Sequence, residues 1–117
     1  MTLPTGSGSE FLNNHVMIGT TSADTFAPAA NHIYTILNFA VHNNHSSSTN
    51  FQVALSRNTG SNYGKLLDAQ TLQVNETFVW SDKIVLYNST SIIRFTPNGS
   101  DPLDIWINYI DQDWTTP

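Results

Sequence analysis

The sequence predicts an all-β protein: a single antiparallel β-sandwich of jelly-roll or Ig-like type, with seven or eight strands and an extended N-terminal arm. Three observations lead to this prediction. Asn, Ser and Thr supply 13, 12 and 14 of the 117 residues, and their short side chains compete with the backbone hydrogen bonds of a helix. Charged residues make up only 11% of the chain, so the helix formers Glu, Lys and Arg are scarce. Several segments alternate apolar and polar residues, with turn signals at intervals of roughly 8–12 residues.

The first fourteen residues predict the arm. Pro4 and two glycines interrupt regular structure there, because proline lacks the backbone donor and glycine costs extra ordering entropy. Phe11 and Leu12 could anchor the arm on a partner. Residues 15–117 are then expected to form one sandwich domain, since the chain is one domain long and shows no internal linker.

The clearest predicted strand is His32–His42, after a short strand at His15–Gly19 and a loop broken by Pro28. A two-residue period places the odd-numbered positions from Ile33 to Val41 on one apolar face. The next segment, FQVALSR, alternates in the same way and follows a polar turn, so the two strands predict a hairpin.

Shorter segments rich in β-branched and aromatic residues follow. They are KLLDAQTLQV, TFVWS, KIVLYN and SIIRFT, before the turn sequence PNGSDP. The last strand, LDIWINYI, is expected to place Ile105, Ile107 and Tyr109 opposite Trp106, Asn108 and Ile110.

Charge and composition exclude several classes of function. The formal net charge is −5 and only four residues are Lys or Arg, whereas phosphate binding needs clustered basic side chains. We therefore expect no nucleic acid and no membrane surface as partner. The sequence holds no cysteine, and its start lacks the pattern of a signal peptide. No apolar run approaches the roughly 20 residues of a membrane helix.

The ionisable residues predict no catalytic site, no cofactor and no metal ligand, so the protein is not expected to be an enzyme. His42 and His45 have an H-x-x-H spacing, but they flank a probable turn, and a structural zinc site needs four ligands. Asp111 and Asp113 could share a face as a calcium or acid/base pair. Their place near the chain end favours a solvated rim instead.

The aromatic and apolar residues outside the expected core predict subunit contacts, because aromatic side chains supply much of the energy of interfaces. The expected interface residues are Leu3, Phe11, Leu12, Phe26, Trp106 and Trp114. Trp114 is the strongest candidate, since it follows the last strand, where an intrachain pocket is hard to supply. The alternative is a sugar-stacking platform of exposed aromatics, centred on Trp106 and Tyr109.

The strand pattern over residues 30–112 resembles small β-sandwich virion proteins of tailed bacteriophages. The resemblance lies in HIYTILNFAVHNNHSSSTNFQVALSR, in KLLDAQTLQVNETFVWSDKIVLYNSTSIIRF and in DIWINYIDQ. One departure is Ser89-Thr90-Ser91, which stands where those proteins usually have Gly-Asp.

The resemblance implies a virion structural protein. Its expected role is capsid decoration, as a cement protein that binds the major capsid protein or other virion proteins and forms a homo-oligomer, a homotrimer. The implied location is the virion, assembled in the host cytoplasm. Two alternatives stay open: a neck, tail or fibre-base component, and a carbohydrate-binding β-sandwich module.

Overall fold

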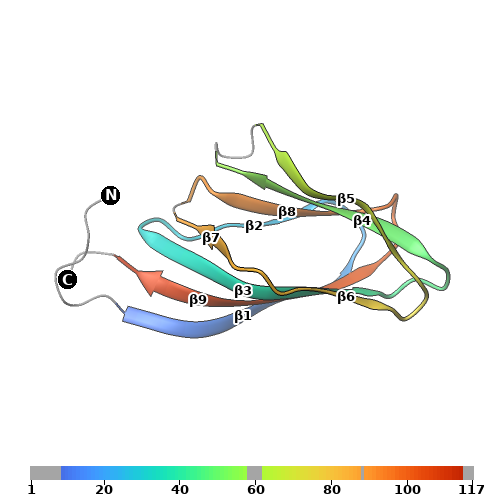
Figure 1. The fold of residues 1–117 in the computed structure, drawn as a ribbon, viewed down its shortest axis with the longest axis horizontal. Helices are drawn as coiled ribbons and strands as arrows, with labels where there is room; N and C mark the ends of the chain where they lie inside the picture. Colours follow the sequence, from blue (N-terminus) through green and yellow to red (C-terminus); the bar gives the residue numbers. More distant parts are fainter. Residues whose placement is uncertain (1–8, 58–61, 88, 115–117) are drawn as a thin grey trace.

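The structure is a computed structural model that describes residues 9–57, 62–87 and 89–114. These residues form two antiparallel sheets packed face to face, which confirms the predicted all-β sandwich (Figure 1). The strands are β1 (Ser9–Thr20), β2 (Asp24–Phe26), β3 (His32–Asn43), β4 (Thr49–Ser56), β5 (Gly64–Leu72), β6 (Thr77–Trp80), β7 (Ile84–Leu86), β8 (Ile92–Pro97) and β9 (Leu103–Asp113). Within the described ranges no helix is long and apolar enough to cross a membrane.

The strand order identifies the sandwich as a jelly roll. One sheet has the order β1-β9-β3-β6, with β7 also paired to β3, and the other has the order β2-β8-β4-β5. Strands β6 and β7 pair with different stretches of β3 and together occupy a single strand position. The chain therefore crosses between the sheets as in the eight-stranded double Greek key.

The described residues form nine strands, one more than the upper number expected. The additional strand is β2, which lies in the predicted loop before His32. Its backbone pairs with β8, and Phe26 is 7% exposed and part of the core. Burial of this one aromatic side chain offsets the weak strand propensity of Asp24.

The first strand begins at Ser9, not at His15. Residues Ser9–Asn14 pair in register with the end of β9, from Asp113 to Asn108. β9 is eleven residues long, so a strand starting at His15 would leave half of this edge of β9 unpaired. Of the predicted arm, residues 1–8 lie outside the described residues.

The core fills the space between the sheets. It is built on three fully buried phenylalanines, Phe39, Phe51 and Phe95, surrounded by β-branched side chains. In β9 the predicted alternation is confirmed: Ile105, Ile107 and Tyr109 are buried, whereas Trp106 is 48% exposed.

In β3 the predicted faces are wrong over half of the strand. The register with β9 shifts between Ile36 and Asn38, so Leu37 is a bulge residue. Before the bulge the core-facing residues are Tyr34 and Ile36, and after it they are Phe39 and Val41. An extra residue inverts the inward and outward sides, because side chains alternate with a period of two.

Candidate interaction surface

The outer side of the five-stranded sheet carries a continuous row of apolar side chains. Residues paired across antiparallel strands share one side of the sheet. Trp106 is paired with Val16 of β1 and with Ala40 of β3, and Ala40 is paired in turn with Val79 of β6. The row therefore crosses β1, β9, β3 and β6.

A second row runs parallel to the first. It joins Leu12 of β1 to Ile110 of β9, then to Thr35 of β3 and Val85 of β7. Ile18 extends the surface at the other end of β1, since it alternates with the buried Met17. The outer apolar face consists of Leu12, Val16, Ile18, Ala40, Val79, Val85, Trp106 and Ile110.

The outer apolar face gathers most of the exposed hydrophobic side chains. Of seven large hydrophobic side chains exposed in the described residues, five lie on it: Leu12 (77%), Ile18 (77%), Val79 (61%), Val85 (49%) and Trp106 (48%). At these exposures they present on the order of 600 Å² of apolar surface, summed over both rows, which equals the upper end of the patches on typical monomers. A patch of this size on one side of a sheet indicates an interaction surface.

A polar row divides the two apolar rows. Asn14, Asn108 and Asn38 are paired across three strands, and Asn108 Nδ2 donates a hydrogen bond of 2.8 Å to Asn38 Oδ1. Beside this row Leu12, Leu37 and Asn108 line an open hollow of about 460 Å³. Amide side chains both donate and accept hydrogen bonds, so this row can match a partner's polar groups without a net charge.

The predicted interface residues separate in the structure. Leu12 and Trp106 lie on the outer apolar face. Phe11 is 56% exposed, but it is paired with Asp111 and so belongs to the other side of the sheet. Leu3 lies outside the described residues.

Phe26 and Trp114 contact their own chain. The Phe26 ring packs against His15, Tyr34 and Tyr109 at centroid distances of 4.7, 5.3 and 5.0 Å, so it is a core residue and is not available to a partner. Trp114 is half-buried, and its backbone N–H donates to Asn31 O at 2.8 Å. The sequence predicts a loop for the segment that holds Phe26, whereas the structure forms strand β2 there.

Sequence reasoning missed Ile18, Val79 and Val85. Val79 lies between Phe78 and Trp80, both of which pack on the core. Alternation therefore points Val79 outward, which is the signal that could have identified it.

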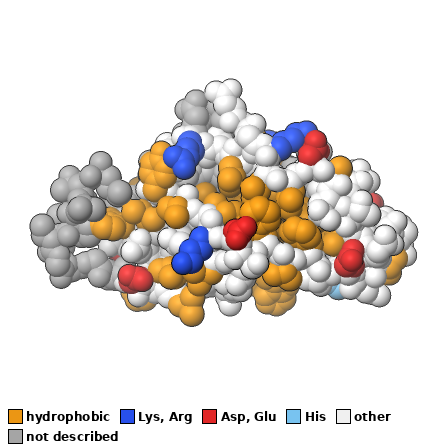
Figure 2. Space-filling view, in the orientation of Figure 1, with side chains coloured by type: hydrophobic (Ala, Val, Ile, Leu, Met, Phe, Trp, Pro, Cys, Tyr) orange, Lys and Arg blue, Asp and Glu red, His pale blue; other side chains and the backbone are white. Residues whose placement is uncertain are grey.

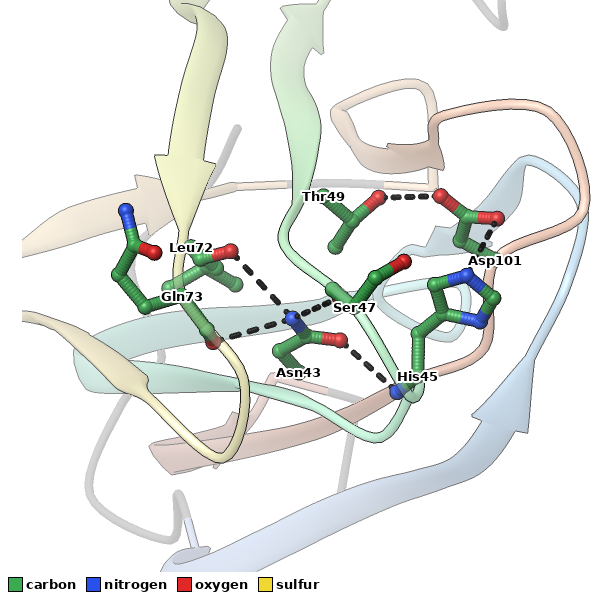
Figure 3. Close-up of polar contacts among 7 residues, drawn as sticks. All are labelled: Asn43, His45, Ser47, Thr49, Leu72, Gln73 and Asp101. Atoms are coloured by element: carbon green, nitrogen blue, oxygen red, sulfur yellow. Dashed lines mark hydrogen bonds and ion pairs between the residues drawn. The ribbon is translucent and has the colours of Figure 1, made fainter.

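His42 and His45 point to different partners. His42 Nδ1 lies 2.8 Å from Thr77 Oγ1, whereas His45 Nε2 lies 3.5 Å from Asp101 Oδ1. Thr49 Oγ1 donates to the other oxygen of Asp101 at 2.6 Å (Figure 3). The H-x-x-H spacing thus forms no joint site, and Asp101 instead ties the β8–β9 turn to the start of β4.

Asp111 and Asp113 lie on one face of β9, and a third residue joins them. His32 lies between the two carboxylates, with Nδ1 2.7 Å from Asp111 Oδ1 and Nε2 3.5 Å from Asp113 Oδ1. This cluster ties the first residue of β3 to the end of β9. No group of three His, Cys, Asp or Glu residues in the described part of the chain is placed to hold a metal ion.

Tyr109 lies beside this cluster. Burial raises the pKa of its hydroxyl, and Tyr34 and Asp111 raise it further, because the charged phenolate would be desolvated and close to other negative groups. Tyr109 is only 6% exposed and Trp106 points to the opposite side of β9. These two residues therefore do not form the coplanar platform that the carbohydrate-binding alternative predicted.

Comparison with known proteins shows similarity to solved structures in fold. No protein-family model matches the sequence, and no curated protein matches it. Among solved structures, Drosophila NLP-core, described for pentamer formation and histone binding, has a TM-score of 0.51 at 15% identity, covering 84% of this chain and 96% of its own.

Two further structures have lower scores. The CBM22-1 xylan-binding domain of Xyn10C from Paenibacillus barcinonensis has a TM-score of 0.48 at 9% identity, covering 97% of this chain and 90% of its own. The VLP of the Macrobrachium rosenbergii extra small virus has a TM-score of 0.45 at 10% identity, covering 97% and 84%. The comparisons therefore show what this chain is similar to in fold: a β-sandwich.

Proposed function

We propose that the chain is a capsid decoration (cement) protein of a tailed bacteriophage, a homotrimer that binds the major capsid protein and stabilises the shell. The observation that carries this proposal is the outer apolar face. A sheet face with five exposed large hydrophobic side chains is unfavourable in water, and burial against another subunit removes that cost.

Two further observations support the proposal. The sequence over residues 30–112 resembles virion proteins of this class, and the jelly roll is a common architecture of viral capsid domains. The second observation is an analogy at the level of the fold, and folds host many functions. The outer apolar face supports assembly with another subunit, and the sequence resemblance supports a place in the virion.

The proposed mechanism is the burial of preformed surface between folded subunits. About 600 Å² of apolar side chain approaches the roughly 800 Å² per partner of a standard interface. Backbone atoms and the asparagine row would supply the remainder. Apolar burial contributes about 25 cal/mol per Å², from which the entropy cost of association is subtracted.

The first test measures assembly. We expect the purified protein to elute as a trimer in size-exclusion chromatography with light scattering, and Ile18→Asp together with Trp106→Ser to convert it to a monomer with an unchanged far-UV spectrum. Val74→Asp is the matched control, because Val74 is 46% exposed in the turn before β6, away from the outer apolar face. This control should remain a trimer.

The second test measures capsid binding. Shells that lack the protein should co-sediment with wild-type protein and should withstand a higher temperature once decorated. The proposal would be wrong if the wild-type protein were a monomer and did not co-sediment with these shells. Binding at the neck, tail or fibre base in a density map would replace the decoration role, and selective glycan binding by the monomer would favour a carbohydrate module.

A further inference from the structure

Over the part of the chain that the structure describes, both long sides of the sandwich lack backbone pairing between the sheets, and one of them lies between β5 and the β6–β7 edge. In the described residues β5 is hydrogen-bonded to β4 alone, and β6 and β7 are hydrogen-bonded to β3 alone, so no backbone pairing joins these edges of the two sheets. This side faces the viewer in Figure 1. Hydrophobic side chains gather over its middle in Figure 2.

A cleft of about 440 Å³ opens in this seam. Its apolar walls come from both sheets, with Leu55 and Leu66 on one side and Ile84 and Leu86 on the other. The volume lies within the roughly 300–1,000 Å³ of small-molecule sites. The seam cleft can therefore hold the apolar body of a small ligand.

Two buried polar groups in the seam cleft have no partner. Ser91 is 2% exposed, and its Oγ makes no hydrogen bond; Trp80 Nε1 is buried and equally unpaired. Both residues line the cleft. An unpaired buried donor is unfavourable, so two such donors on residues that line one cleft favour a bound group that accepts hydrogen bonds from them.

The charge of the seam cleft differs from that of the whole chain. The chain has nine carboxylates and four Lys or Arg residues, yet Arg57 and Lys83 both line the cleft and no Asp or Glu does. The Arg57 guanidinium lies 5.0 Å from the centre of the Tyr87 ring, within the range of a cation–π contact. The polar end of the ligand is therefore expected to be an anion.

We propose that the seam cleft binds a small amphiphilic carboxylate with a medium-length apolar chain. The chain lies between Leu55, Leu66 and Ile84. The carboxylate lies towards Arg57 and Lys83 and accepts hydrogen bonds from Trp80 Nε1–H and the Ser91 hydroxyl. This site shares Val85 alone with the outer apolar face and does not depend on the proposed function.

The test follows the Trp80 indole N–H in ¹H–¹⁵N spectra of the full chain, assigned with Trp80→Phe, during titration with octanoate. We expect a saturable downfield shift. Acetate, which lacks the apolar chain, and 1-octanol, which lacks the charge, should bind at least tenfold more weakly. The absence of a shift up to about 10 mM octanoate, where even a Kd of about 1 mM is saturated, would overturn the proposal, as would equal binding of 1-octanol.

Three variants distinguish a loss of octanoate binding at the seam cleft from a loss of folding stability. Arg57→Gln with Lys83→Gln should weaken octanoate binding at least fivefold, whereas Lys65→Gln, which removes an exposed lysine paired with Asp68, should not. Ser91→Ala should weaken octanoate binding while leaving the unfolding midpoint of the free protein equal or higher, because it removes an unpaired buried hydroxyl. Unchanged affinity in the double variant would contradict the site.

Discussion

Asn43, the last residue of β3, has a fully buried side chain that holds one end of the sandwich together. Its Nδ2 lies 3.0, 3.3 and 3.0 Å from the carbonyl oxygens of Ser47, Leu72 and Gln73, and its Oδ1 accepts from His45 N at 2.8 Å (Figure 3). A single side chain thus satisfies backbone groups of the β3–β4 turn and of the end of β5. Buried backbone groups need such partners where the strand pairing ends.

Replacing Asn43 with Ala should destabilise the fold by about 2–4 kcal/mol, because it leaves several buried backbone groups unsatisfied. Urea unfolding followed by tryptophan fluorescence measures this change. Asn44→Ala is the control: its side chain is exposed in the same turn, and we expect less than about 0.5 kcal/mol. An equal decrease in the free energy of unfolding in the two variants would show that the hydrogen bonds of Asn43 do not stabilise the fold.

Among the elements, β3 connects the two halves of its sheet and carries the bulge. Its apolar residues occupy both odd and even positions on either side of Leu37, so a two-residue period fits either phase. Ile36 is even-numbered and Phe39 is odd-numbered, yet both are buried in the core. The bulge at Leu37 makes this possible, because it shifts the alternation by one residue.

Deleting Leu37 should lower the free energy of unfolding far more than replacing it with Ala. The deletion joins the two halves without the bulge, so either Tyr34 and Ile36 or Phe39 and Val41 must turn outward, at about 1.5–3 kcal/mol for each large side chain that loses burial. Leu37→Ala keeps the backbone and should cost less than about 2 kcal/mol, because Leu37 is only partly buried. Circular dichroism and urea unfolding compare the two, and a deletion variant as stable as Leu37→Ala would show that the bulge does not set the faces.

The same elements explain what the sequence could predict. The all-β class and the faces of β9 followed from composition and unbroken alternation. The three residues of β2 are too few for a period to show, and Phe26 was therefore misplaced. The outer apolar face needed the register of four strands, because Val16, Trp106, Ala40 and Val79 are far apart in the sequence and meet only through pairing.

At the scale of the whole molecule, the sandwich measures 51 × 28 × 21 Å and carries a formal net charge of −5. Nine carboxylates share this surface with only four Lys or Arg residues. Compaction brings like charges together, and their repulsion disfavours the folded state. Salt screens that repulsion over a Debye length of about 10 Å at 0.1 M.

We expect stability at pH 8 to rise by about 0.5–1 kcal/mol between 20 and about 200 mM NaCl, as screening reduces the repulsion. Thermal unfolding at one protein concentration measures the change. Lys65→Gln makes the net charge more negative and should increase the response, whereas Asp82→Asn should reduce it. A fall in stability with added salt would mean that attractive pairs outweigh the repulsion.

The pairing of Ser9 with Asp113 has a consequence for engineering. The outermost residues of the first and last strands are direct neighbours, so a short linker could close the chain into a ring without disturbing any strand pair. New ends could then be cut in the exposed stretch Thr21–Ala23 between β1 and β2, giving a circular permutant. In the native order, two cargo domains fused directly next to Ser9 and Asp113 would leave from the same corner of the scaffold.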